Sequence, residues 1–450
     1  MKALMKLAHK IFIFCSRAFL LNRLPQARDI NKVSSGQTQT SGERSFNVQA
    51  GRDVNLTVDM SSISEDIRDL LSKAAVPNDA ESQHILRLIE DGRVKEAEAL
   101  VDSVFNDTSN DYANKARNAG NLYAKINRDK AIYCYTQSTS IQNNDYDTLN
   151  ILALLLLEKG SQDEALAIFD EILANSNKNE VNEKVHGNLG VLYKNNGKTS
   201  EALSHLFKAV ELATASQNTL GSCKHLNNIG SCYNNIENTQ NAEKYLSEAL
   251  NLSKIAVENS TSTLEKQAIK SVKSNILTNL SITAQRQYKD TNDTNYLALA
   301  ETHLLAAIEI DETLNNSIGL GRHYGNLANV LRLKGDLANS RKYIEKSIIA
   351  FQNNHSLKDE LTSRMNLGRA FAVEGNLQEA IKNFKESKEQ NSAELYPKLY
   401  ALTLMNMAYT HLKLNSVQEA KDCATEALEV MKKLNLTSYI TMLEYDFKIR

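Results

Sequence analysis

Residues that stop helices are scarce in this sequence. Only three of its 450 residues are proline, and tryptophan is absent altogether. Proline removes a backbone N–H donor and clashes with the preceding helical turn, so it commonly marks a helix end. The scarcity of proline therefore favours an almost wholly helical chain.

The chain also lacks an excess of charge of either sign. It holds 52 Lys and Arg against 54 Asp and Glu, which gives a formal net charge of −2. A near-neutral balance provides no general electrostatic reason to bind nucleic acid. We therefore expect no nucleic acid among its partners.

Paired cysteines are missing as well. The five cysteines are odd in number, scattered and without a CxxC motif, and most fall on predicted helix faces. Cysteine in such a setting is usually a small buried hydrophobe, and the pattern indicates a reducing, cytoplasmic location. These residues are Cys15, Cys134, Cys223, Cys232 and Cys423.

Catalytic motifs are absent too. The sequence contains no HExxH, Walker A, GxSxG or zinc-type Cys/His spacing. The glycine-rich run Gly319–Gly325 (GLGRHYG) lacks a preceding strand, so we interpret it as a closely packed loop at a repeat boundary. We therefore predict a protein without catalytic residues, metal or cofactor, and not an enzyme.

What the chain does contain is a repeated unit, clearest from Glu183 to Ala213. This stretch reads as two amphipathic helices joined by a turn at Gly197, where only glycine turns the chain without steric cost. Ala202, Leu206 and Ala209 follow at helical spacing, as in a buried stripe. One such hairpin cannot bury its own apolar face, so it must stack on copies of itself.

The copies share two small residues twelve positions apart, one on each helix of a hairpin. Eight units fall into register between about Asn118 and Ala427. Five pairs keep the spacing with Gly or Ala throughout, one has serine, one is a residue short, and one carries an insertion around KDTNDTN (289–295). In chain order the pairs are Gly120/Ala131, Ala153/Ala165, Gly190/Ala202, Gly230/Ala242, Ser281/Ala300, Ala328/Ser340, Gly368/Ala380 and Ala408/Ala420.

This pattern resembles the tetratricopeptide repeat over roughly 310 of the 450 residues. Two features depart from that family, because its Trp and its closing Pro are missing from the repeats. Equivalent positions are mostly 37 to 40 residues apart, against the usual 34, so longer helices of the kinesin-light-chain-like type are expected. The resemblance implies an all-α, right-handed superhelical solenoid of antiparallel helix pairs, of bacterial origin.

Composition shifts divide the chain into five predicted segments. These are a basic amphipathic helix (1–24), a linker with a β-hairpin signal (25–60), capping helices with a degenerate leading repeat (61–109), the repeat solenoid (110–433) and a C-terminal capping helix (434–450). The apolar run in 1–24 is too short to span a bilayer. It could instead lie on the inner membrane surface, dock on the solenoid or a partner, or reflect a misassigned start codon.

One position of the first helices is almost always asparagine, two residues before the small residue. An amide offers one acceptor and two donors, which suits a peptide bond, and first helices about 10 Å apart match three extended residues. In the resembled family this position faces the concave groove. The predicted peptide-binding row is Asn118, Asn188, Asn228, Asn279, Asn326, Asn366 and Asn406.

The same residues admit a structural interpretation, in which each asparagine bonds to the neighbouring repeat. Basic residues three, four or six positions from the row could bind acidic side chains or a terminal carboxylate, or form an ordinary solvated face. They are Lys184, Lys194, Lys224, Arg322, Arg332 and Arg369.

The sequence thus predicts a non-enzymatic scaffold or adaptor that binds a protein or peptide in a concave groove. The alternative is a peptide-responsive regulator, or a sensor subunit of a larger complex such as a bacterial defence assembly. A Gly/Asn-rich stretch, FNVQAGRDVNLTV (46–58), is similar to strand segments that often precede repeat or NTPase modules in bacterial conflict-related proteins. The partner and the oligomeric state are not encoded in any recognisable motif.

Overall fold

The computed structural model describes residues 80–91, 93–105, 112–354 and 356–449, together with the backbone of 47–50 and 54–57. The predicted helix over 1–24 and most of the linker and capping segment up to residue 79 lie outside the described residues. Strands β1 (Asn47–Ala50) and β2 (Val54–Thr57) pair antiparallel, with Asn47 opposite Thr57. No side chain of these strands is described.

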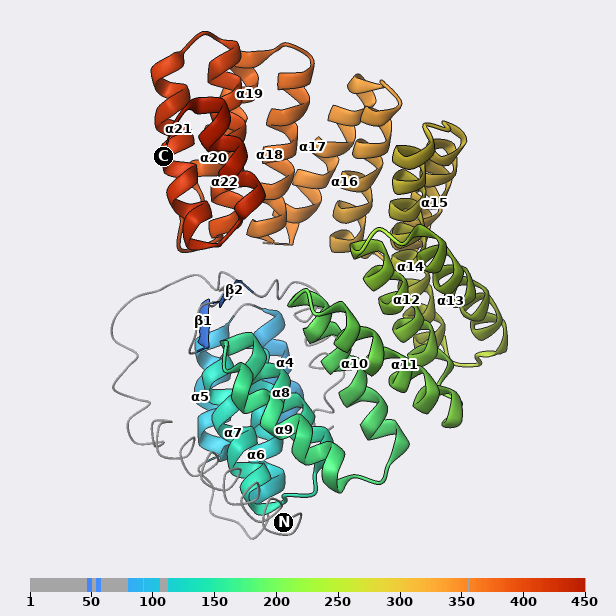
Figure 1. Ribbon diagram of the computed structural model, residues 1–450. Coiled ribbons are helices and arrows are strands. Elements are labelled where there is room, and N and C mark those ends of the chain that lie inside the picture. Colours follow the sequence, from blue (N-terminus) through green and yellow to red (C-terminus); the bar gives the residue numbers. More distant parts are fainter. Residues whose placement is uncertain are drawn as a thin grey trace, which may run out of the picture. The chain divides into compact units, whose positions relative to one another are not determined.

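The packed fold is all-α, with 19 helices in the described part of the chain (Figure 1). They form nine consecutive pairs, each with a first and a second helix, followed by one last helix. The first helices are α4 (Ala80–Glu90), α6 (Tyr112–Tyr123), α8 (Tyr146–Lys159), α10 (Asn179–Asn195), α12 (Thr219–Asn235), α14 (Thr263–Thr291), α16 (Ser317–Leu333), α18 (Leu357–Val373) and α20 (Pro397–Lys413). The second helices are α5 (Val94–Phe105), α7 (Arg128–Ile141), α9 (Gln162–Asn175), α11 (Thr199–Ala215), α13 (Thr239–Asn259), α15 (Asn295–Thr313), α17 (Leu337–Asn353), α19 (Leu377–Glu389) and α21 (Val417–Lys433), and α22 (Thr437–Phe447) ends the stack.

The helices have the length that the repeat spacing predicts. Eight of them, including α10, α12 and α16, span 17 residues each, about 25 Å at 1.5 Å per residue. Helix α14 reaches 29 residues, so most of the inserted segment is additional helix rather than loop. Its C-cap is Asn292, whose backbone adopts the left-handed conformation.

Six turns between first and second helices contain a residue with positive φ seven positions after the small residue. Gly197 fills it as predicted, with φ +71°, and Gly160, Gly335 and Gly375 are equivalent. Glu237 has the same conformation, with φ +59°, although an L-residue is disfavoured there. The turn is therefore a property of the repeat rather than of glycine alone.

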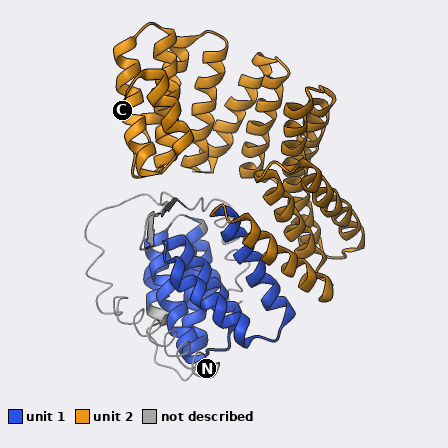
Figure 2. Cartoon of the chain, viewed as in Figure 1, with its two compact units in different colours: residues 1–40, 58–195 blue, residues 41–57, 196–450 orange. Residues whose placement is uncertain are grey.

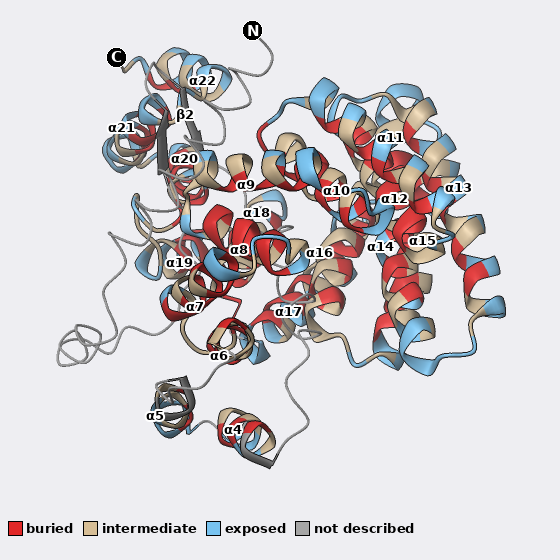
Figure 3. Ribbon diagram, turned by 90° about the horizontal axis from the view of Figure 1, so that it is seen from below, coloured by how far each residue is buried: buried red, intermediate tan, exposed pale blue. Residues whose placement is uncertain are grey.

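The predicted small pairs form the contact between paired helices. Ala153, Ala165, Ala202 and Ala242 are fully buried, and Ser340 is 1% exposed. Figure 3 shows buried residues along the faces where helices meet. A Cβ built on Gly368 would lie 2.6 Å from the Phe384 ring, so glycine is required there to make room for the large residue that follows Ala380 by one helical turn.

The glycine-rich run Gly319–Gly325 is not a loop. It lies inside α16, whose N-cap is Asn316; the Asn316 side chain accepts a hydrogen bond from the Gly319 backbone N–H. The expectation of close packing is confirmed, because a Cβ on Gly319 would overlap the Asp311 carboxylate. The loop interpretation failed because it did not recognise Asn316 as a helix cap.

The helices fall into two compact units (Figure 2), with α4–α10 in unit 1 and α11–α22 in unit 2. The division after Asn195 lies inside the hairpin 183–213 that the sequence shows most clearly. Unit 1 holds one buried apolar cluster that runs from Ile85 to Leu192. Unit 2 holds several smaller clusters, one of which joins α20, α21 and α22 around Leu443.

A membrane-crossing helix is not among the elements that the structure describes. None of the described helices combines the length and the apolar character needed to cross a bilayer.

Candidate peptide-binding face

Several consecutive first helices contact one another directly. Helix α12 contacts α14, α14 contacts α16 and α18 contacts α20, while α8 contacts α10 in unit 1. Among the described helices, consecutive second helices make no comparable contact. The surface formed by the first helices is here called the first-helix face.

All seven predicted asparagines are on first helices and half-buried. Two of them bond to the preceding first helix, as the structural interpretation expects. The Asn188 Nδ2 donates to Asn150 Oδ1 at 2.9 Å, and the Asn279 Nδ2 donates to Asn227 Oδ1 at 2.8 Å. These two amides link neighbouring repeats, and each has one donor hydrogen engaged inside the protein.

The remaining asparagines differ from one another. The Asn406 Nδ2 donates to the Leu402 carbonyl of its own helix, and the Asn366 Oδ1 accepts from Arg369. Within the described residues, the side chains of Asn118 and Asn326 make no hydrogen bond, whereas Asn228 interacts with a neighbour. The row is thus a set of amides in different states rather than a uniform ladder.

The predicted basic residues also divide. The exposed Lys184 pairs with Asp147 on the preceding first helix at 2.9 Å, as a solvated surface pair does. Lys194, Lys224 and Arg322 are half-buried and have interaction partners. Arg332 and Arg369, here called the arginine pair, donate to neutral acceptors.

Each member of the arginine pair donates to an asparagine three residues earlier in its helix. The Arg332 Nη2 lies 2.9 Å from Asn329 Oδ1, and the Arg369 Nη1 lies 3.5 Å from Asn366 Oδ1. Burial, and then the like charge of Arg369, lower the pKa of Arg332. Arg332 and Arg369 lie on the successive first helices α16 and α18.

The hydrogen bonds that join neighbouring first helices on this face were not predicted from the sequence. The Asn329 Nδ2 donates to Gln285 Oε1 at 2.6 Å, and Asn234 binds α14 twice, through the Asn279 carbonyl and the Thr283 hydroxyl. The signal was available, because Gln285 follows its small residue by four positions and Asn329 follows its own by one. Recognising it requires the offset between helices, which the sequence pattern does not give.

A buried polar cluster also lies in unit 2. Asp311 is fully buried and accepts from the Ser274 hydroxyl at 3.0 Å and from Asn316 Nδ2 at 3.2 Å, while His323 Nε2 lies 2.8 Å from its carboxylate. His323 is 1% exposed, and its Nδ1 lies 2.8 Å from Thr278 Oγ1. Ser, His and Asp are the residue types of a hydrolase triad, but Asp311 and His323 are buried and no substrate can reach them. The cluster instead links α14, α15 and α16.

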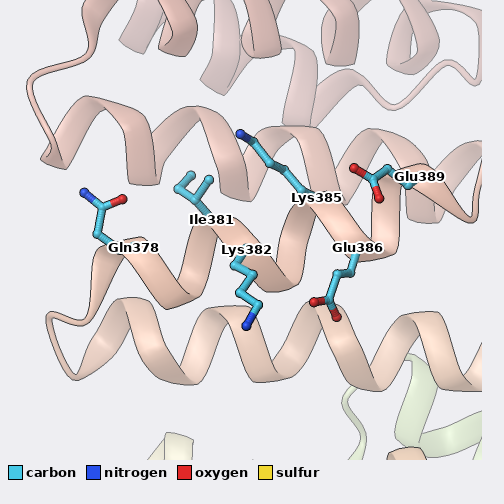
Figure 4. A pocket seen from close by; sticks show the side chains of 6 residues that line it. All are labelled: Gln378, Ile381, Lys382, Lys385, Glu386 and Glu389. Carbon is cyan, nitrogen blue, oxygen red and sulfur yellow. The ribbon is translucent and has the colours of Figure 1, made fainter.

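One hollow of about 380 Å³ lies along α19, a second helix (Figure 4). Its lining comes from that helix alone and mixes both charges with one apolar side chain. Among the described residues, no group of three or more His, Cys, Asp or Glu has a metal-binding arrangement. The hollow is lined by Gln378, Ile381, Lys382, Lys385, Glu386 and Glu389.

Comparison with known proteins identifies the repeat. Two tetratricopeptide-repeat family models match residues 226–255 and 319–390, and no curated protein sequence matches the chain. A solved structure of a signal transduction ATPase with numerous domains and a tetratricopeptide-repeat sensor, from Pyrococcus horikoshii, has a TM-score of 0.51 at 11% identity. That similarity covers 88% of this chain and 68% of the other, and it shows the fold.

Two further structures are similar to a lesser degree. A Rap protein complexed with Competence and Sporulation Factor has a TM-score of 0.46 at 13% identity, over 85% of this chain and 97% of that one. BtubC from P. vanneervenii has a TM-score of 0.42 at 13% identity, over 53% of this chain and 90% of that one.

Proposed function

Because the chain is a tetratricopeptide-repeat protein, we propose that it is a non-enzymatic scaffold that binds a protein or peptide along its first-helix face. The observation that carries the proposal is the row of half-buried amides on first helices, several of which use no donor hydrogen within the described residues. Asn326 has no bond within the described residues, and Asn366 uses only its acceptor, toward Arg369. Amide donors in this state suit the carbonyl groups of an extended peptide.

We propose that only some of the seven asparagines in the row contact the peptide. Asn188, Asn279 and Asn406 have donor hydrogens engaged within the protein, so they support the stack more than they contact a ligand. Asn326 and Asn366 occupy equivalent positions on the neighbouring first helices α16 and α18, inside unit 2. We place the peptide across these two helices.

Affinity capture with a paired control tests this function. The test variant is Asn326→Ala with Asn366→Ala, and the control variant is Asn251→Ala with Asn353→Ala, which changes two exposed amides on second helices. We expect partners bound by the wild type and the control to be lost from the test variant. Identical partner sets for all three proteins would show that binding does not use this face.

A further inference from the structure

On the first-helix face of unit 2, the same two repeat positions hold a bonded pair of amides in one place and two arginines in the next. Between α14 and α16, the residue four after the small residue (Gln285) meets the residue one after the next small residue (Asn329), and the two amides bond at 2.6 Å. Between α16 and α18, the equivalent residues are Arg332 and Arg369. A bond between helices is thus replaced by two like charges.

A buried cluster shared by α16, α17 and α18 supports this equivalence. Ala328 of α16 and Ala370 of α18 belong to one buried cluster, together with Leu367. Arg332 lies one helical turn beyond Ala328, and Arg369 directly precedes Ala370. The two arginines therefore belong to helices that share one buried cluster. They occupy the positions at which Gln285 and Asn329 bond between α14 and α16.

Neither member of the arginine pair has an acidic partner among the described residues. Each instead donates to a neutral amide, at 2.9 Å for Arg332 and 3.5 Å for Arg369. Other basic residues of unit 2, such as Lys334 and Arg364, form ion pairs with glutamates. Two uncompensated cations close together repel each other, and an anion between them would convert that repulsion into two attractions.

We propose that the arginine pair binds a doubly charged phosphoryl group between α16 and α18. A guanidinium group presents a planar fork of donors that matches phosphate oxygens, and two forks need an anion with several oxygens and two charges. A single carboxylate would leave one positive charge uncompensated. The proposal rests on the proposed function only in placing the site on the binding face, since the anion alone can occupy it.

Binding of inorganic phosphate at constant ionic strength tests the site. The test variant is Arg332→Gln with Arg369→Gln, and the control is Lys382→Gln with Lys385→Gln on α19, which changes the net charge equally. We expect one saturable site in the wild type and the control, measured by isothermal titration calorimetry. In the test variant, affinity should fall by about tenfold or more, as expected for losing charge-assisted hydrogen bonds.

Two results would overturn the proposal. One is the absence of saturable phosphate binding in the wild type, and the other is equal affinity in the arginine variant. Thermal unfolding gives a second measurement that does not depend on calorimetric heats. Phosphate should raise the Tm of the wild type and the lysine variant, and an equal rise in the arginine variant would again exclude the site.

The source of the phosphoryl group is resolved by comparing two probes. A tripeptide with a central phosphoserine should bind more tightly than inorganic phosphate if the group is carried by a peptide, and no more tightly if the ligand is a free anion. The two proposals also fail separately. If phosphate binds but partner capture does not depend on Asn326 and Asn366, only the proposed function is refuted. If partner capture depends on these asparagines but phosphate does not bind, only the phosphoryl site is refuted.

Discussion

At the scale of single residues, glycines inside helices mark where paired helices come closest. Gly368 faces the ring of Phe384, and a Cβ there would come within 2.6 Å of it. Gly325, also inside a first helix, has only the Ser347 Oγ near its Cβ direction, at the ordinary contact distance of 3.6 Å. The two glycines thus have the same backbone setting and different surroundings.

Substituting each glycine with alanine should have opposite effects. Gly368→Ala should lower the free energy of unfolding by about 1–3 kcal/mol, because the new methyl group displaces a buried ring. Gly325→Ala should raise it by about 0.5–1 kcal/mol, because alanine favours the helix. Urea unfolding followed by circular dichroism measures both, and equal destabilisation by the two variants would contradict the packing explanation.

The same scale shows what the sequence could and could not predict. The small pairs were predictable, because small residues twelve positions apart leave a periodic trace in the sequence. The asparagine contacts were only half predictable, since the residue type fixes the donors and acceptors but not the partner. Asn188 and Asn406 occupy equivalent positions, yet one bonds to a neighbouring helix and the other to its own.

At the scale of elements, the Asp311 cluster fixes three helices by polar contacts rather than apolar ones. Its donors come from Ser274 on α14, from Asn316 in the turn before α16 and from His323 on α16, while Asp311 belongs to α15. The sequence did not reveal this cluster, because its members are separated by up to 49 positions and match no motif. It lies next to the longest helix and joins it to the following repeat.

Removing the carboxylate should therefore weaken several elements together. Asp311→Ala should lower the free energy of unfolding by about 3–5 kcal/mol, because its buried donors lose their acceptor. As a control, Glu211→Ala removes one partner of the exposed Lys208–Glu211 pair and should cost less than about 1 kcal/mol. Chemical denaturation gives both values, and a cost for Asp311→Ala no larger than the control would contradict this role.

Element boundaries followed from caps more than from periodicity. Asn218, Asn238, Asn316 and Asp336 each accept a hydrogen bond from the backbone N–H three residues later. The mistaken loop at Gly319–Gly325 shows the limit of treating glycine as a helix breaker. There, tight packing against Asp311 and Phe351 outweighs the low helix propensity of glycine.

At the scale of the whole molecule, the repeats form two units with different cores. The sequence gives one continuous register through residues 110–433, and its regular spacing contains no sign of a division after Asn195. Four aromatic side chains in the described residues are less than 2% exposed, and three of them, Tyr123, Tyr135 and Phe169, belong to unit 1, whereas Phe384 belongs to unit 2. Large buried side chains contribute most to hydrophobic stabilisation, so unit 1 should be the more stable of the two.

The absence of tryptophan makes this difference measurable, because one introduced tryptophan reports on its own surroundings. Tyr146→Trp places the probe against the core of unit 1, and Tyr439→Trp places it against the last cluster of unit 2. Since repeat contacts are mostly between neighbours, we expect two fluorescence transitions with a higher urea midpoint for Tyr146→Trp. Circular dichroism of each variant should match the wild type, which controls for damage by the probe. Coincident midpoints would mean that the stack unfolds as one cooperative body despite its two cores.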